Sequence, residues 1–220
     1  DNGRRIWIYD HSVPLLTLRG NADLLVRAGI AFVGYDDGSV VSLRVADGSV
    51  VWSQTIASPD GRTELDRLAD IGQQMVIIAS DLIVSSYKSR VVSIAADSGR
   101  LLWFKDISSA TGVQVDRTNL AISEQNGDLW MLDRRNGSTI WKLDRMSNRG
   151  LTRPVFYGNY VVVGDVEGYL HWIDTDIGSF VARVRPAKQP LAATPLTVGT
   201  TMYVLTSKGK LIAYRAGAAI

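Results

Sequence analysis

The stretch DGSVVSLRVADGSVVW, residues 37–52, decides how this chain folds. It holds a turn that ends in glycine, an apolar strand, a second turn with Asp and Gly, and a strand that ends in tryptophan. The same order recurs, with first-turn positions at 38, 89, 127, 168 and 209, which are 51, 38, 41 and 41 residues apart. A period of about 40 residues is typical of β-propeller blades. We therefore predict an all-β chain, a β-propeller with four-stranded blades of about 40 residues.

The repeats divide the chain into about five blades. They lie near residues 10–55, 75–105, 113–144, 152–184 and 192–215. They belong to a single propeller domain over residues 1–220, or to a fragment of one. The last repeat stops without its tryptophan strand, whereas residues 4–7 supply such a strand without the rest of a blade. Two arrangements stay open: a ring closed by the two ends of the chain, or part of a larger ring.

Four tryptophans share one register, four residues after the second glycine of their repeats. They are Trp7, Trp52, Trp103 and Trp141, and the fourth repeat has Ala182 in the same position. A large aromatic side chain buries area that smaller ones cannot, so we expect these rings to pack between adjacent blades. Stacking on a ligand is the alternative interpretation.

The composition excludes several classes of protein. The chain has 24 basic and 22 acidic residues, a formal net charge of +2, and therefore lacks the electrostatic footprint of a nucleic-acid-binding protein. It has no cysteine, which excludes disulfides, thiolate zinc sites and cysteine nucleophiles. Its longest apolar runs are of strand length, far short of the roughly 18 residues that a membrane-spanning helix needs.

Catalytic motifs are absent from the sequence. Neither His11 nor His171 lies in an HExxH pattern or beside a nucleophile, and His171, in a strand between Leu170 and Trp172, is predicted to be structural. The acidic segment 174–178 has part of a calcium-loop pattern without the later bidentate acid, which favours an ordinary β-turn. We predict no enzyme activity, no cofactor and no metal site.

One interval exceeds the period. About ten extra residues fall near residues 56–74, where charged and apolar side chains alternate irregularly. Propellers place binding functions on such loops. A solvated loop and a partner site are both compatible with this segment.

Three segments carry a family resemblance. They are LTLRG at 16–20, TELDRLAD at 63–70 and GDVEGYLHWI at 164–173. The chain resembles the C-terminal portion of the BamB family, outer-membrane protein assembly factors of the BAM complex in Gram-negative bacteria. The likeness runs over nearly the whole chain, and the GDVEGYLHW segment is its most specific part.

The resemblance implies a non-enzymatic scaffold subunit. It implies part of an eight-bladed propeller at the periplasmic face of the outer membrane, attached only through an N-terminal lipid anchor outside this chain. The implied partners are the POTRA domains of BamA, with unfolded outer-membrane proteins as further candidates. The implied contact residues are Leu16, Leu18, Arg19 and Asp70, whereas Gly72 stands where the family has a second acidic residue.

The residues themselves are compatible with this contact. In an extended segment Leu16 and Leu18 point to one face and Arg19 to the other. An exposed apolar pair beside an arginine has the composition of an interface hot spot, whereas buried leucines would be core residues. Arg19 would pair with Asp70 inside the protein, or both would face the partner. The alternative function is a quinoprotein-like enzyme or a ligand-sensing propeller.

Overall fold

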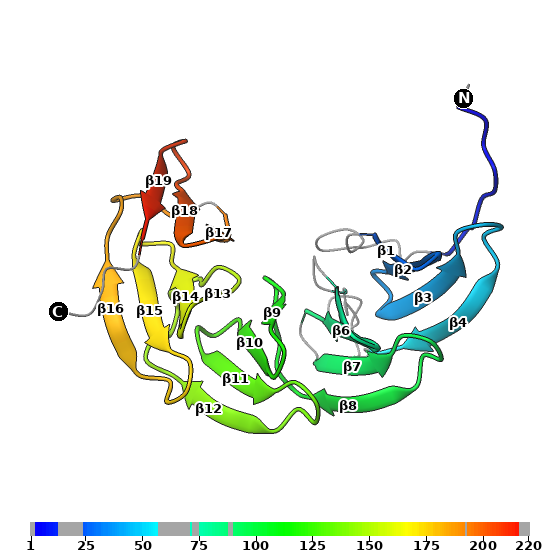
Figure 1. The fold of residues 1–220 in the computed structure, drawn as a ribbon, viewed down its shortest axis with the longest axis horizontal. Helices are drawn as coiled ribbons and strands as arrows, with labels where there is room; N and C mark the ends of the chain where they lie inside the picture. Colours follow the sequence, from blue (N-terminus) through cyan, green and yellow to red (C-terminus); the bar gives the residue numbers. More distant parts are fainter. Residues whose placement is uncertain are drawn as a thin grey trace, which may run out of the picture. The chain divides into compact units, whose positions relative to one another are not determined.

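The computed structural model describes residues 3–12, 24–56, 71, 75–87, 90–191 and 193–215. The chain forms two compact units, residues 1–110 and 111–220, and the strands of each unit are shown in Figure 1. The described secondary structure consists of β-strands. These strands form antiparallel sheets in which the order across the sheet follows the order along the chain. Hairpins with short glycine-containing turns produce this arrangement, because they connect neighbouring antiparallel strands.

In the first unit, the residues that the structure describes form two four-stranded sheets. The strands of the first sheet are β1 (Leu25–Arg27), β2 (Ile30–Gly34), β3 (Ser39–Arg44) and β4 (Val50–Thr55). Those of the second are β5 (Val76–Ile78), β6 (Asp81–Ser85), β7 (Val91–Ala95) and β8 (Leu101–Lys105). Apolar side chains from both sheets share one buried cluster, which includes Phe32, Val40, Leu82 and Val92. Each sheet therefore buries a face against its neighbour, as blades do.

The described residues of the second unit form two four-stranded sheets and one three-stranded sheet. The third sheet has β9 (Val113–Val115), β10 (Asn119–Ser123), β11 (Leu129–Asp133) and β12 (Thr139–Leu143). The fourth has β13 (Val155–Tyr157), β14 (Tyr160–Gly164), β15 (Leu170–Asp174) and β16 (Phe180–Val184). The last has β17 (Leu196–Val198), β18 (Thr201–Leu205) and β19 (Leu211–Tyr214). The predicted all-β chain with four-stranded antiparallel blades is confirmed.

The first strands of these three sheets lie next to one another, since β13 contacts both β9 and β17. Two buried apolar clusters fill the space between successive sheets. One joins the third and fourth sheets through residues such as Met131, Val161 and Ile173. The other joins the fourth and last sheets through residues such as Trp172 and Met202.

In the first and fourth sheets, the second turn of the repeat is closed by one of its own aspartates. Asp47 Oδ1 accepts a hydrogen bond from the Ser49 amide at 2.9 Å. Asp174 Oδ1 likewise accepts from the amides of Asp176 and Ile177, at 2.9 and 3.1 Å. An Asp side chain that bonds to the backbone two residues later is the usual device of an acidic turn. The 174–178 segment therefore has the geometry of a β-turn, as its sequence favours.

Three of the repeated tryptophans pack on the second turn of the next sheet. Each of these three donates from Nε1–H to the backbone carbonyl of the first residue in that turn, at 2.8 to 2.9 Å. The pairs are Trp7 with Val45, Trp52 with Ala96, and Trp141 with Thr175. The rings also lie against the turn glycines 48, 99 and 178. The predicted packing between adjacent blades is thus confirmed for these tryptophans.

A β-bulge accompanies the tryptophan position in each four-stranded sheet. The register between the third and fourth strands shifts by one residue, so Val51, Leu102, Ile140 and Val181 are left without a Cα partner. A bulge changes which face the following side chain occupies. In β16 it brings Phe180 opposite Ile173 and Ala182 opposite Trp172.

The fourth sheet replaces its missing tryptophan from the neighbouring strand. Trp172 lies directly opposite Ala182, and it is buried in the cluster shared with the last sheet. Its ring meets Tyr157 edge to face, with centroids 5.3 Å apart. A small residue at 182 is therefore compatible with a filled core at this position.

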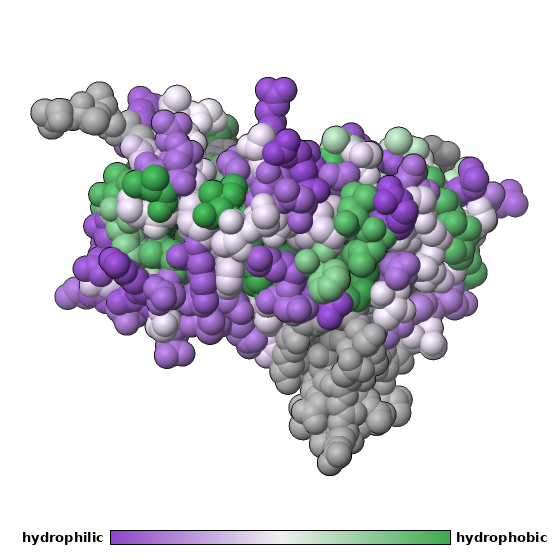
Figure 2. Space-filling model, turned by 90° about the horizontal axis from the view of Figure 1, so that it is seen from below, coloured by the Kyte–Doolittle hydropathy of each residue, from purple (hydrophilic) through white to green (hydrophobic). Residues whose placement is uncertain are grey.

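The fourth strand of each four-stranded sheet is exposed along most of its length. Apolar side chains such as Val50, Phe104, Ile140 and Val181 are accessible there. Figure 2 shows one face of the molecule, on which apolar and polar side chains are interspersed. Singly exposed apolar residues of this kind are normal on a protein surface.

Candidate functional site

The four residues predicted to contact a partner, Leu16, Leu18, Arg19 and Asp70, lie outside the described residues, as does Gly72. Most of the long 56–74 segment lies outside them too. Ile71, which follows Asp70, is described: it is buried and forms an isolated β-bridge with Ser86. The partner-site assignment therefore stays a prediction.

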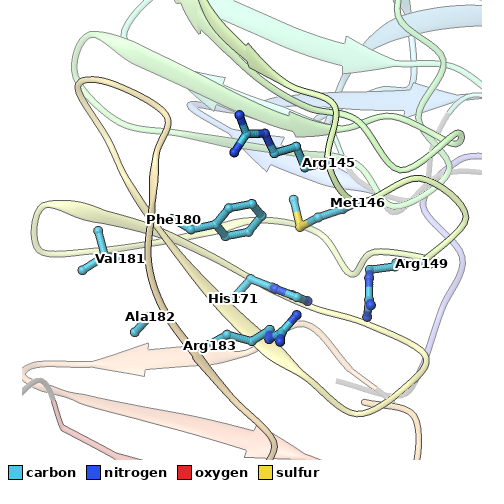
Figure 3. Close-up of a pocket in the computed structure, with 8 residues that line it drawn as sticks. All are labelled: Arg145, Met146, Arg149, His171, Phe180, Val181, Ala182 and Arg183. Atoms are coloured by element: carbon cyan, nitrogen blue, oxygen red, sulfur yellow. The ribbon is translucent and has the colours of Figure 1, made fainter.

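A pocket of about 350 Å³ lies in the second unit, beside the GDVEGYLHW segment. Figure 3 shows the side chains around it. Three are arginines, at 145, 149 and 183, and three others are the apolar side chains Met146, Phe180 and Val181. His171 and Ala182 complete the lining (Figure 3). The pocket thus combines positive charge with an apolar surface.

Strands β15 and β16 form one side of this pocket. His171 in β15 and Arg183 in β16 are register partners, and side chains directly opposite each other share one face of a sheet. Tyr169 and Arg185 continue this face by two residues, and the guanidinium of Arg185 lies 4.7 Å from the Tyr169 ring centre. The bulge in β16 adds Phe180 to the same face, since it opposes Ile173.

The connection between β12 and β13 forms the other side. Met146 is buried in the cluster between the third and fourth sheets, which fixes the segment that carries Arg145 and Arg149. Backbone hydrogen bonds also hold it: the Asn148 amide donates to Asn126 at 3.0 Å. Asn148 has φ +61°, a left-handed conformation that asparagine tolerates better than most residues.

A buried carboxylate organises the polar part of the site. Asp165 Oδ2 accepts hydrogen bonds from Arg149 Nη1 at 2.7 Å and His171 Nε2 at 2.9 Å. Its Oδ1 accepts from the amides of Glu167 and Tyr169, at 3.0 and 2.8 Å. Both carboxylate oxygens are therefore saturated, which is what permits a charge to be buried at this position.

The pKa values follow from this geometry. Burial alone would raise the pKa of Asp165, but the hydrogen bonds from His171, the Tyr169 amide and Arg149 outweigh it and lower that pKa below its ordinary value. Burial lowers the pKa of His171, and the hydrogen bond to Asp165 only partly offsets this effect. Asp165 is therefore charged and His171 neutral near pH 7.

Neutral His171 leaves one ring nitrogen without a partner. Because Nε2 donates to Asp165, the proton is on Nε2 and Nδ1 is an acceptor. Nδ1 is buried and has no hydrogen-bond partner among the described residues. The predicted structural histidine is thus satisfied at one nitrogen and unsatisfied at the other.

The arginines differ in how their charge is balanced. Arg149 binds Asp165 and also Glu167, the latter at 3.2 Å. Within the described part of the chain, no carboxylate lies within ion-pair distance of Arg145 or Arg183. The pocket therefore carries an excess of positive charge, which suits an anionic group.

This pocket was not predicted from the sequence. Its segment was identified only as a family signature, and the roles of Arg149 and Arg183 were missed. One signal was available: Tyr169 and His171 are two residues apart in one strand, and Arg183 and Arg185 are two residues apart in the next, so each pair lies on one face of its strand. Nothing local to Arg149 indicates that it reaches Asp165, which is 16 residues away.

The described residues provide no group of three His, Asp or Glu side chains suited to hold a metal ion. In the same described part of the chain, no helix is long and apolar enough to cross a membrane.

Comparisons with known proteins agree on one family. The family model described as outer membrane protein assembly factor BamB matches residues 1–143. The outer membrane protein assembly factor BamB of Pseudomonas aeruginosa is 39% identical over 93% of this chain and 54% of its own length. The chain spans about half the length of the curated relatives it matches.

Solved structures give the same result. The crystal structure of BamB from Moraxella catarrhalis superimposes with a TM-score of 0.86 and 26% identity, over 97% of this chain and 64% of that one. A quinohemoprotein alcohol dehydrogenase from Pseudomonas putida shares only the fold, with a TM-score of 0.63 and 13% identity over 91% of this chain and 42% of that one. The repeat pattern, the blades and the family match together show that the chain belongs to the BamB family of outer membrane protein assembly factors.

Proposed function

We propose that this chain is part of a non-enzymatic scaffold subunit of the outer-membrane β-barrel assembly machinery. It acts by binding: it docks on the periplasmic POTRA domains of BamA and aids the assembly and insertion of β-barrel proteins. The observation that carries this proposal is the family match over residues 1–143. Its location would be the periplasmic face of the outer membrane.

The proposed contact consists of Leu16, Leu18, Arg19 and Asp70. Two leucines beside an arginine supply the apolar and cationic groups that interface hot spots are rich in. Asp70 directly precedes Ile71, which is buried in the first unit. The glycine at 72 removes one charge that the family places there.

A quinoprotein-like enzyme or ligand-sensing propeller is the less supported function. The likeness between this chain and the quinohemoprotein alcohol dehydrogenase extends to the fold alone, at 13% identity. The relatives that share more sequence carry the name of an assembly factor.

A binding titration against purified BamA POTRA domains tests the proposal. The wild-type chain is compared with Leu18→Ala and Arg19→Glu, after circular dichroism has verified that each variant is folded. Loss of a hot-spot side chain costs about 2 kcal/mol or more, so binding should weaken at least about tenfold. Thermal stability should stay nearly unchanged for Arg19→Glu.

Arg100→Glu is the matched control, because Arg100 is an exposed arginine on the turn between β7 and β8. It should bind within about twofold of wild type if general charge effects are small. A large stability loss for Arg19→Glu, with unchanged binding per folded molecule, would make Arg19 structural. A folded wild-type chain that does not bind would contradict the docking proposal, and assays for bound quinone and calcium dependence would then test the alternative.

A further inference from the structure

We propose that the pocket beside His171 binds an acidic segment of a protein partner, with one carboxylate at Arg145, another at Arg183 and an apolar side chain between them against Phe180. This inference goes beyond docking on BamA and uses none of the residues assigned to that contact. It rests on two features of the pocket: the placement of its arginines and its apolar wall (Figure 3).

The charge favours a carboxylate. Arg149 is neutralised within the protein by Asp165 and Glu167, whereas Arg145 and Arg183 have no ion-pair partner among the described residues. Guanidinium groups match the planar geometry of a carboxylate and bind it with two parallel hydrogen bonds. The Asp165 network fixes Arg149 in place, so the two remaining cations are the groups available to a ligand.

The placement of the two arginines favours a peptide over a simple anion. Arg145 and Arg183 lie at opposite ends of the pocket, with Phe180 and Met146 between them (Figure 3). A peptide reaches both ends with two carboxylates, whereas a single phosphate reaches only one guanidinium. His171 lines the pocket, but its buried Nδ1 is sealed from solvent and is not a contact for the ligand.

The apolar wall favours a hydrophobic residue next to the acid. Phe180 is 39% exposed although it is large and aromatic. Met146, which also lines the pocket, is held in the buried cluster between the third and fourth sheets. The volume of about 350 Å³ is at the lower end of the usual range for ligand pockets, which suits one or two side chains rather than a large cofactor.

The test uses the blocked peptide acetyl-Gly-Glu-Phe-Glu-Gly-amide and its matched analogue with Gln in place of both Glu residues. Binding to the whole chain is measured by isothermal titration calorimetry. The acidic peptide should bind at least about tenfold more tightly than the analogue, because a charge-assisted hydrogen bond contributes roughly a factor of ten or more. Arg183→Gln and Arg145→Gln should each weaken binding of the acidic peptide by at least about fivefold.

Arg100→Gln serves as the control for net charge, and its affinity should stay within about twofold of wild type. Equal weakening in Arg100→Gln and Arg183→Gln would reduce the effect to general electrostatics and overturn the proposal. So would the absence of saturable binding by the folded wild-type chain, or equal affinity for the two peptides.

Inorganic phosphate supplies the last arm of the experiment. It should compete only weakly, since it cannot reach both arginines and lacks the apolar group. Phosphate that binds as tightly as the acidic peptide, and depends equally on Arg183, would assign the site to phosphate groups instead. Binding of the POTRA domains by Arg183→Gln is measured in parallel, so failure here and failure of BamA docking are distinguishable.

Discussion

The Trp141 ring lies directly against Gly178 in the turn between β15 and β16. A Cβ atom built on Gly178 would come within 2.6 Å of the ring, and the indole Nε1–H donates to the Thr175 carbonyl at 2.8 Å. Gly178 also has φ +67°, where side chains other than glycine are strained. One glycine thus permits both the turn and the contact between two neighbouring sheets.

Gly178→Ala should therefore destabilise the chain more than an alanine at a turn glycine without a neighbour. Gly158 has φ +58° and nothing within 4 Å of an added Cβ, which makes Gly158→Ala the matched control in the same sheet. The control should cost about 1 to 2 kcal/mol of unfolding free energy through backbone strain. Gly178→Ala should cost about 1 to 3 kcal/mol more because the ring must move. Urea denaturation measures both, and equal losses would contradict the packing argument.

Removing the ring should abolish that difference. Trp141→Ala leaves space over Gly178, so adding Gly178→Ala to it should cost only about as much as Gly158→Ala does in the wild-type chain. The single variant Trp141→Ala is itself expected to lose about 2 to 4 kcal/mol, because the ring is only half-buried. A double-mutant cycle followed by urea denaturation gives the coupling free energy. Additive losses would show that the two residues do not constrain each other.

Asp165→Asn should strongly destabilise the second unit. The side chain is fully buried and accepts from both Arg149 and His171, so its removal leaves a cation without its partner. Breaking a buried ion pair costs about 3 to 5 kcal/mol, and about 2 to 4 is expected here because Arg149 remains partly accessible to water.

Glu167→Gln is the control for Asp165→Asn, since Glu167 binds the same guanidinium from an exposed position. It should change the unfolding free energy by no more than about 0.5 to 1 kcal/mol. Chemical denaturation of both variants at pH 7 makes the comparison. Similar losses would mean that the burial of Asp165 has no special role.

His171 should make stability depend on pH. Asp165, Arg149 and Arg183 face the ring, and burial holds its pKa below the ordinary value of 6.5, so the unfolded chain takes up the proton first. The contribution of His171 to the unfolding free energy is fully present above pH 6.5. It is lost as the pH falls from 6.5 toward the pKa of His171 in the folded chain. His171→Gln should flatten the unfolding free energy between about pH 7 and 5. Parallel curves for the two proteins would contradict the assigned shift.

Asp165 acts in a more acidic window. Its pKa is lowered in the folded chain, so its contribution is present above the unfolded value of 3.8 and is lost as the pH falls through the folded pKa. The acid unfolding of wild type should therefore be steeper below about pH 4 than that of Asp165→Asn. Unfolding monitored by far-ultraviolet circular dichroism across this range tests the difference.

Much of the fold could be predicted from local pattern. Gly48 and Gly178 end acidic turns, and the tryptophans that follow four residues after such glycines predicted packing between blades. The sequence shows that Ala182 stands where the other repeats have tryptophan. It does not show that Trp172 fills this space, because the pairing of Trp172 with Ala182 depends on the bulge in β16. The proposed partner residues, Leu16, Leu18, Arg19 and Asp70, depend on the family resemblance.

The sequence by itself determined the repeat, the turns and the register of the tryptophans, since each of these depends on residues only a few positions apart. Only the tertiary structure decided which carbonyl Trp141 meets, 34 residues later, and that Arg149 reaches the carboxylate of Asp165. It also decided that His171 and Arg183 share one wall of a pocket with an unsatisfied nitrogen. Such contacts arise when neighbouring sheets pack, and packing joins residues whose separation along the chain carries no periodic signal.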